Sequence, residues 1–360
     1  MVKSINLVNF RNFKKKHIDF SEKLTIIVGP NASGKTNILE ALFLLSSGKS
    51  FKASLEEEMI GYNNDLARIT GKLSSMQNVE SSMLEAILTR GIDGWPRKRL
   101  LVNGVPKRLI DFAGNFKVVL FGPWDLDLVT ESPSLRRRFL DMVLSQVDRE
   151  YRRAFLSYEK GLRQRNRLLF RIREEGLSRG QLLFWNQLLI KNGDYISQKR
   201  EELINFINSE EDINNTKYEI TYDKSSISEG RLKQYAEEEV AAGTTLVGPH
   251  RDDLLFRIQT NKKETRDLAI YGSRGEQRMG ILWLKLRELA FVEEKTMDST
   301  SLTIRGASGR PTLLLDDILS ELDHDHRKVV LSVIGNQQTI ITTADEHFIK
   351  GFKKVDLIKL

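Results

Sequence analysis

The 360-residue chain contains no cysteine and no long run of uncharged apolar residues. Without cysteine, disulfides, thiolate zinc sites and cysteine nucleophiles are excluded. A membrane-spanning helix takes about 20 consecutive apolar residues, and no segment approaches that length, so we expect no membrane partner. The N-terminus also lacks the apolar core of a secretory signal. Because a chain without cysteine suits a reducing compartment, we expect a cytoplasmic protein.

The composition is that of a globular protein with a basic balance. Hydrophobic residues make up 40% and charged residues 29% of the chain, which is enough to form a core, and the length suits about two domains. The net charge of +7 suggests an anionic partner such as nucleic acid. From Leu135 to Arg173, twelve Arg or Lys stand against four Asp or Glu. This one segment therefore carries more than the whole positive excess.

The apolar pattern places strands and helices at both ends of the chain and a basic helical segment between them. A long helical region begins at Pro133, and a second helical run covers Gln181–Ile207, so two antiparallel helices are expected. Asn103-Gly104 predicts a hairpin turn, and Asp267–Tyr271 is predicted as a strand. We expect three parts: residues 1–130 and 216–360, which together form one α/β core, and residues 131–215, which form an inserted helical arm.

Gly29-Pro30-Asn31-Ala32-Ser33-Gly34-Lys35-Thr36 fits the P-loop pattern G-x-x-x-x-G-K-[ST], with a strand before it and a helix after it. Glycines let the backbone N–H groups surround phosphate oxygens, and the helix N-terminus favours negative charge. Lys35 would add a charge on the β and γ phosphates, and Thr36 would offer its hydroxyl to Mg²⁺. The residues predicted to contact ATP here are Gly29, Pro30, Asn31, Ala32, Ser33, Gly34, Lys35, Thr36 and Asn37.

A second nucleotide motif, of the Walker B type, follows the apolar strand Thr312–Leu315. Asp316 would bind Mg²⁺ together with Thr36, and Asp317 would orient the attacking water. Lys35, Asp316 and Asp317 are thus the predicted catalytic residues. A strand ended by a polar turn gives the same pattern, but the P-loop upstream favours a nucleotide site.

Gly272-Ser273-Arg274-Gly275-Glu276 resembles the signature motif that distinguishes ABC-type ATPases from other P-loop proteins. In that class, the serine and the helix N-terminus bind the γ-phosphate held by the other subunit. We therefore expect Ser273, Gly275 and Glu276 to contact ATP across an ATP-dependent homodimer. The same residues also have the spacing of a helix capping box, and both interpretations can hold at once. Ser320–Asp323 stands where the D-loop is expected.

Nearly end to end, the chain resembles the RecF family of bacterial recombination mediators, within the ABC/SMC-like ATPases. The resemblance rests on Asn9–Phe13, Ser132–Asp141, the G-P-H-R-D-D block within Thr244–Asp253, and the nucleotide motifs. It implies an ABC-type head with a helical lobe, and it adds Arg11 to the nucleotide contacts. It also implies a weak, DNA-stimulated ATPase that dimerises on ATP, binds DNA at single-strand/double-strand junctions, and loads the recombinase at gaps with RecO and RecR. An ABC transporter subunit and an SMC-like chromosome protein are the alternatives.

Three departures from ABC sequences predict slow turnover. Gly122–Asp125 occupies the Q-loop position without a glutamine, and Thr343–Asp345 stands at the switch position, with His347 beyond it. Asp317 is one methylene shorter than the usual glutamate. Because misplacing a reacting group by about 1 Å can reduce a rate about 100-fold, we expect a slow, switch-like ATPase.

The basic segment is the first candidate for DNA binding, through phosphate contacts. A solvated helix face, or a surface packed on acidic patches, is the alternative, and the sequence shows no aromatic-interleaved platform for single strands. His250 and Arg251 have either a structural role or a role near nucleotide or DNA. The predicted DNA contacts are Arg137, Arg138, Arg149, Arg152, Arg153, Arg163 and Arg167.

Overall fold

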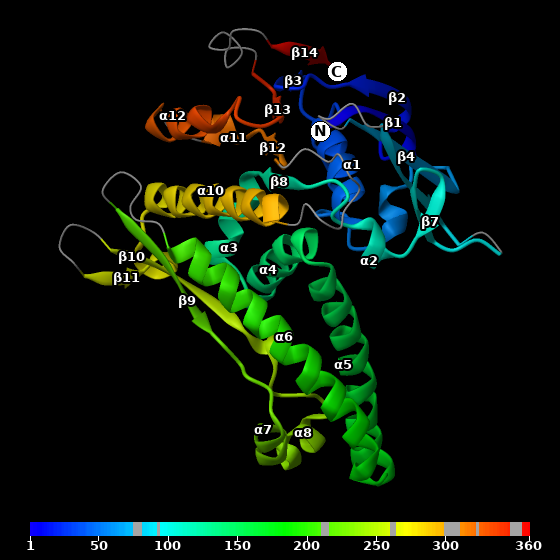
Figure 1. The fold of residues 1–360 in the computed structure, drawn as a ribbon, viewed down its shortest axis with the longest axis vertical. Helices are drawn as coiled ribbons and strands as arrows, with labels where there is room; N and C mark the ends of the chain where they lie inside the picture. Colours follow the sequence, from blue (N-terminus) through cyan, green and yellow to red (C-terminus); the bar gives the residue numbers. More distant parts are fainter. Residues whose placement is uncertain are drawn as a thin grey trace. The chain divides into compact units, whose positions relative to one another are not determined.

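A computed structural model describes residues 1–74, 81–91, 94–209, 216–259, 264–298, 310–321, 324–345 and 355–360. The chain divides into two compact units (Figure 1). Unit 1 comprises Met1–Asp125 and Leu284–Leu360, and unit 2 comprises Leu126–Trp283. Unit 2 is therefore an insertion within the sequence of unit 1.

Unit 1 contains a five-stranded parallel sheet in the order β14-β3-β13-β12-β8. Every residue of β3, β12 and β13 is buried, as is typical of parallel strands covered on both faces. The bounds of its strands are β3 Leu24–Val28, β8 Val118–Phe121, β12 Thr312–Asp316, β13 Thr339–Thr343 and β14 Asp356–Lys359.

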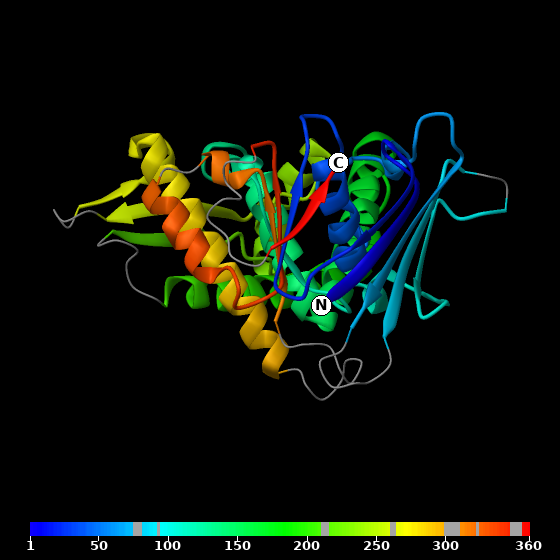
Figure 2. The same ribbon diagram turned by 90° about the horizontal axis from the view of Figure 1, so that it is seen from above.

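A six-stranded antiparallel sheet, in the order β2-β1-β4-β5-β6-β7, completes unit 1. Helix α1 (Lys35–Ser47) packs against both sheets (Figure 2). At Gly71 of β4 a Cβ atom would lie 2.5 Å from a methyl carbon of Leu45, so glycine permits this close contact. The bounds are β1 Val2–Phe10, β2 Phe13–Asp19, β4 Leu66–Leu73, β5 Ser82–Thr89, β6 Lys98–Val102 and β7 Val105–Lys107.

The mixed α/β fold and the hairpin predicted from the sequence are both confirmed. Strands β6 and β7 pair across Asn103 and Gly104, whose φ angles are 52° and 77°. Two positive φ angles in succession are the geometry of a type I′ turn. Further helices described in unit 1 are η1 Glu56–Met59, α2 Leu109–Phe112, η2 Pro123–Leu126, which ends one residue inside unit 2, α11 Ile318–Glu321 and α12 His324–Val333.

Unit 2 is built on three long helices, α4 (Pro133–Val147), α5 (Arg149–Glu175) and α6 (Leu183–Asn208). Helices α5 and α6 form the expected antiparallel pair. The predicted continuous helical region is interrupted at Asp148, whose carboxylate accepts a hydrogen bond from the backbone N–H of Tyr151. A side chain that caps a new helix N-terminus in this way explains why the chain turns there.

The remaining elements of unit 2 include a three-stranded antiparallel sheet in the order β11-β10-β9. The strand predicted over Asp267–Tyr271 is wrong after its first residue. Asp267 accepts hydrogen bonds from the N–H groups of Ala269 and Ile270, and so starts a helical turn. The bounds are β9 Lys217–Asp223, β10 Asp253–Gln259, β11 Thr265–Asp267, α3 Asp127–Thr130, η3 Arg179–Leu182, α7 Glu229–Gln234, α8 Ala236–Ala242, η4 Pro249–Arg251, α9 Leu268–Tyr271 and α10 Arg274–Asp298, which continues into unit 1.

The second domain boundary differs from the one expected. Residues 216–283, which we assigned to the ATPase head, belong to unit 2. The reason is local packing: β9 pairs with β10, and the Asn208 amide of α6 bonds both the N–H and the carbonyl of Ile220 in β9. A strand pattern alone does not reveal which core a strand joins.

Candidate functional site

The P-loop connects buried strand β3 to helix α1 in unit 1. Gly34, with φ 105°, lies just before the helix in a conformation that suits glycine. A Cβ atom at Gly34 would lie 2.6 Å from the ring of Phe13 and 2.8 Å from the amide of Asn12. Ala32 also has a positive φ of 67°. The loop is thus held in the curled backbone that a phosphate cradle requires.

Lys35 is buried, and its ammonium group donates to two carbonyls of its own loop. The distances from Nζ are 2.7 Å to the oxygen of Gly29 and 3.0 Å to that of Pro30. Carbonyls solvate a cation but do not neutralise its charge. The arrangement therefore suits an anionic ligand lying against the loop.

The Walker A and Walker B motifs meet at one hydrogen bond. The hydroxyl of Thr36 donates to Oδ2 of Asp316 over 2.7 Å, and the hydroxyl of Thr342 donates to Oδ1. Burial raises the pKa of the Asp316 carboxyl, while the hydroxyls of Thr342 and Thr36 oppose that rise. Carboxylate and hydroxyl oxygens this close form the kind of hard-oxygen site that Mg²⁺ prefers.

Asp317 is held in an unusual backbone conformation beside this site. Its φ is 49°, in the left-handed region that non-glycine residues rarely adopt. Its N–H donates to both the carbonyl and the hydroxyl of Thr342, each over 3.1 Å, and its carbonyl accepts from Ser320. Strained backbone at such a position is typical of functional sites, so Asp317 stays a prediction with structural support.

Arg11 lies in the β1–β2 turn, and the protein itself occupies its guanidinium. It forms a two-pronged ion pair with the fully buried Glu40 of α1, at 2.8 and 2.6 Å, and donates to the carbonyl of Glu58. The neighbouring Asn12 instead reaches the P-loop, where it donates to the carbonyl of Ser33 and accepts from Asn37. A contact between Arg11 and nucleotide stays a prediction.

Sequence reasoning missed Asn12, Glu40 and Thr342. Thr342 had a usable signal, because it lies near the end of a buried strand, and the carboxyl ends of parallel strands meet at one edge of a sheet. Asn12 and Glu40 had none, since nothing in a single sequence shows that they contact the loop and its helix.

The signature segment lies in unit 2, at the start of α10. The N–H of Ser273 donates to Glu276 over 2.7 Å, and the N–H of Glu276 donates to the Ser273 hydroxyl over 3.3 Å, which confirms the capping box. Burial acts to raise the pKa of Glu276, but the bonds from Ser273 and the charge of Arg266 outweigh it, so the pKa is lowered. Ser273 and Gly275 are exposed, and a Cβ at Gly275 would meet no atom within 4 Å. The turn is thus fixed by two hydrogen bonds and exposed at its surface.

The positions of the other ABC elements are partly described. At the Q-loop position, Asp125 accepts a hydrogen bond from the N–H of Gly122 over 2.8 Å and lies 3.7 Å from the ammonium of Lys285. His347 and the last two D-loop residues, Leu322 and Asp323, lie outside the described residues.

The seven arginines predicted to contact DNA differ in how exposed their side chains are. Arg152 is buried and donates to the carbonyl of Ser145, so it leaves the set of candidates. Arg137 is half-buried and donates to the carbonyl of Asp252 over 2.7 Å, and Arg153 is paired with Glu150. The four exposed candidates are Arg138, Arg149, Arg163 and Arg167.

The G-P-H-R-D-D block belongs to a buried polar network inside unit 2. Arg200 of α6 donates to Asp252 and to the carbonyl of Pro249, at 2.8 and 2.7 Å, and to Asp141 of α4 at 2.7 Å. Tyr222 of β9 also donates to Asp252. The block therefore joins helices α4 and α6 to the three-stranded sheet.

His250 is partly buried in the same region, and Arg251 is exposed there, so the role of Arg251 stays a prediction. The Nδ1 atom of His250 lies 2.8 Å from the Tyr158 hydroxyl, and Nε2 lies 3.0 Å from the carbonyl of Thr245. Burial lowers the pKa of His250 to about 4, so the ring is neutral at pH 7 and fills both of its hydrogen-bonding positions. Arg251 donates to the same carbonyl of Thr245.

Membrane-spanning helices and self-sufficient metal clusters are both absent from the described part of the chain. No helix in the described ranges combines the length and apolar character of a membrane span. Those ranges also hold no cluster of three or more His, Asp or Glu side chains that would bind a metal without further ligands. A metal at Thr36 and Asp316 would therefore depend on ligands from nucleotide and water.

Comparison with known proteins gives a consistent result. Residues 1–359 match the family described as RecF/RecN/SMC N terminal domain. The DNA replication and repair protein RecF of Herpetosiphon aurantiacus is 36% identical over 375 residues, which cover 96% of this chain and 93% of that protein. A solved structure of the recombination mediator protein RecF-ATP in the RecFOR pathway has a TM-score of 0.82 at 33% identity, and the match covers 96% of this chain and 92% of that one. An Smc head bound to the C-winged helix domain of ScpA has a TM-score of 0.51 at 17% identity over 98% of this chain and 92% of that one, a likeness of fold alone.

Proposed function

The chain belongs to the RecF family of ABC/SMC-like ATPases, and on that premise we propose an ATP-dependent DNA-binding protein of recombinational repair and replication restart. It dimerises on ATP, binds DNA at single-strand/double-strand junctions, and helps to load the recombinase at gaps together with RecO and RecR. Its ATPase activity is weak and stimulated by DNA.

The observation that carries this proposal is the hydrogen bond between Thr36 and Asp316, which brings the two nucleotide motifs together across 280 residues of sequence. With Lys35 in the adjacent loop, it supplies one buried cation and one pair of hard oxygen ligands. These residues fit MgATP. Thr36 and Asp316 would hold Mg²⁺ there, and the metal would offset the negative charge of the phosphates.

Each residue at this site has a task that its surroundings support. Lys35 leaves its two loop carbonyls to bind the β and γ phosphates. Thr36 and Asp316 hold the Mg²⁺ ion that accompanies the nucleotide. Asp317, fixed by Thr342, orients water, and its short side chain makes that positioning imperfect, which gives slow turnover.

The signature turn completes the site from a second copy. Ser273 is exposed and its N–H and hydroxyl are preset by Glu276, so it presents a helix N-terminus to a γ-phosphate. A site that is complete only in the dimer makes assembly depend on the triphosphate.

To test ATP-dependent dimerisation, the molecular mass of the protein in solution is measured without nucleotide, with ADP and with ATP. A dimer should form only with ATP, and Ser273→Arg should prevent it while the monomer still binds nucleotide. Ser228→Arg is the matched control, because Ser228 also caps an exposed helix in unit 2. A wild-type protein that stays monomeric with saturating ATP contradicts the proposal. Gel shifts on gapped DNA, with and without ATP, then test the DNA partner.

A further inference from the structure

The outer face of the six-stranded antiparallel sheet has a pattern that the ATP site does not explain. Along β4, Ala67, Ile69 and Gly71 are buried on the side that packs against α1. Arg68 and Lys72 alternate with them and are exposed. Because successive side chains point to opposite faces, these cations lie on the face away from α1.

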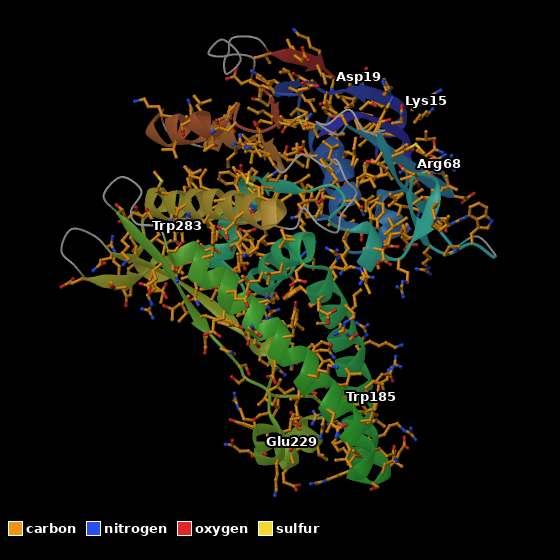
Figure 3. All side chains as sticks on the ribbon, viewed as in Figure 1. Lys15, Asp19, Arg68, Trp185, Glu229 and Trp283 are labelled. Atoms are coloured by element: carbon orange, nitrogen blue, oxygen red, sulfur yellow. The ribbon has the colours of Figure 1, made fainter. Side chains whose placement is uncertain are left out.

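The strand register places three cations in one row across this face. Lys15 pairs with Val8 and Val8 with Arg68, and Arg68 pairs with Ile87 and Ile87 with Arg99. The cations thus stand on alternate strands β2, β4 and β6, about 10 Å apart at two strand spacings. Figure 3 labels Lys15 and Arg68 on this sheet.

Trp95 lies at the β6 end of the row. The guanidinium carbon of Arg99 is 5.7 Å from the centre of the indole, and Trp95 is 47% exposed. Its segment is fixed to β5, because Thr89 donates from its N–H to the carbonyl of Arg97 and from its hydroxyl to that of Pro96. A large aromatic ring is therefore displayed on an ordered segment, with a cation against it.

Glu85 and Asp19, the acidic side chains of these strands on this face, lie one and two rows away from the cations. Glu85 is largely covered, 3.8 Å from Arg68, and accepts a hydrogen bond from Thr70. Asp19 is bound to His17. The row of Lys15, Arg68 and Arg99 contains no carboxylate of its own.

We propose that this row, with Trp95 at its end, binds single-stranded nucleic acid. The strand's phosphates lie along Lys15, Arg68 and Arg99, and a base stacks on Trp95. Cations that follow the backbone and an aromatic ring that takes a base are the two elements of single-strand recognition without sequence preference. A protein partner is less suited, because interface centres are depleted in charge. The inference rests on the proposed function and adds the surface that takes the unpaired bases.

The first test measures binding of a fluorescent oligothymidylate in the presence of ATP. Trp95→Ala should weaken that affinity about 10-fold, the size expected for the loss of one stacked base, while affinity for a blunt duplex is unchanged. Trp95→Phe should keep most of the affinity, since a ring remains. Phe184→Ala is the matched control, because Phe184 is an exposed aromatic residue, 63% accessible, on α6 of unit 2. This variant should bind the oligothymidylate with the affinity of the wild-type protein.

The second test concerns the cations. Lys15→Gln combined with Arg68→Gln should lower the salt dependence of oligothymidylate binding by about 1.4 in the log–log slope, because each phosphate that a protein neutralises on a single strand contributes about 0.7. Lys14→Gln combined with Lys16→Gln removes the same charge from β2, but from positions that alternate with Lys15 and so point to the other face. That control should leave the slope close to that of wild type.

Several outcomes overturn the inference. They are an unchanged affinity in Trp95→Ala, an equal loss in Trp95→Phe, and an equal change of slope in the Lys14 and Lys16 control. Loss of RecO or RecR binding in Trp95→Ala, with oligothymidylate affinity intact, would assign the surface to a protein instead. If the wild-type protein binds neither oligothymidylate nor gapped DNA, the proposed function itself fails, which is a separate result.

Discussion

Buried charges at the nucleotide site of unit 1 and in the polar network of unit 2 are compensated in different ways. In unit 1, the partners of Lys35 are two carbonyls and those of Asp316 are two hydroxyls. In unit 2, Arg165 binds Glu239, and Arg200 binds Asp141 and Asp252. Neutral partners only partly replace the hydration that a buried charge loses, whereas an opposite charge with good geometry offsets more of it.

The kind of partner that a charged side chain has distinguishes ligand-binding residues from structural residues better than the number of charges in a segment does. The basic segment of unit 2 suggested a DNA surface, yet Arg136, Arg152 and Arg165 within it are buried and bound by protein groups. The nucleotide site of unit 1 has few charges, but those it has keep their charge available for a ligand. Partner type is therefore the better guide to function in this chain.

The largest effect is expected from breaking the unit 2 network. Arg200→Ala leaves Asp141 and Asp252 without their cation and should lower the free energy of unfolding by about 3 to 5 kcal/mol. Urea unfolding measures this. Arg163→Ala, an exposed arginine in the same unit, should change stability by less than about 0.5 kcal/mol. Similar values for the two variants would show that the buried pairs of Arg200 do not stabilise unit 2.

In unit 1 the corresponding change should affect function and spare stability. Lys35→Ala should reduce ATP turnover by about 100- to 1,000-fold, because the variant has no charge aimed at the transferred phosphoryl group. The urea midpoint should hardly move, since only neutral carbonyls lose a partner. Lys49→Ala is a matched control, as Lys49 stands in a second Gly-Lys-Ser tripeptide outside the P-loop. Turnover within tenfold of wild type would show that Lys35 does not serve the reaction.

Acid should weaken unit 2 through His250. The pKa of His250 is about 4 in the folded protein and about 6.5 in an unfolded chain, so between these values the unfolded state binds the proton and the fold does not. The stabilisation is complete above pH 6.5 and is lost as the pH falls toward 4, by about 2 kcal/mol from pH 7 to pH 5. Unfolding free energies at several pH values should show this dependence reduced by that amount in His250→Gln. His17→Gln, an exposed histidine on β2, should leave it as in wild type.

The smallest effect concerns the start of α5. Asp148→Ala should lower the unfolding free energy by about 1 kcal/mol, because the N–H of Tyr151 no longer has its cap. Asp148→Asn keeps an oxygen at the same place and should recover most of the stability. If alanine and asparagine variants are equally unstable, the carboxylate acts through its contact with the Tyr195 hydroxyl instead.

The sequence predicted what depends on local order, and it failed where distant segments meet. The strand expected before the P-loop is β3, and the turn at Asn103 and the capping box at Ser273 follow from residue type and spacing alone. The ion-pair partners of the buried arginines do not follow from the local sequence. Arg165 and Arg200 find carboxylates 74 and 52 residues away, and apolar periodicity carries no information about such partners.

The same limit applies to the row on the outer sheet face. Lys15, Arg68 and Arg99 lie far apart in the sequence, and only the strand register aligns them. The residue pattern therefore did not indicate an aromatic platform for single strands, although the sequence contains Trp95. Exposure and register, rather than residue type, identify that surface.

Unit 2 leaves and rejoins unit 1 at neighbouring points, because Asp125 and Lys285 flank the two crossings and their side chains lie 3.7 Å apart. An insertion whose ends already meet can change length, or be exchanged for another, much as a surface loop can. Insertions of different lengths at this position should therefore leave the Walker residues of unit 1 unchanged. Replacing residues 126–283 with a short Gly/Ser linker offers a direct route to a free-standing nucleotide-binding core.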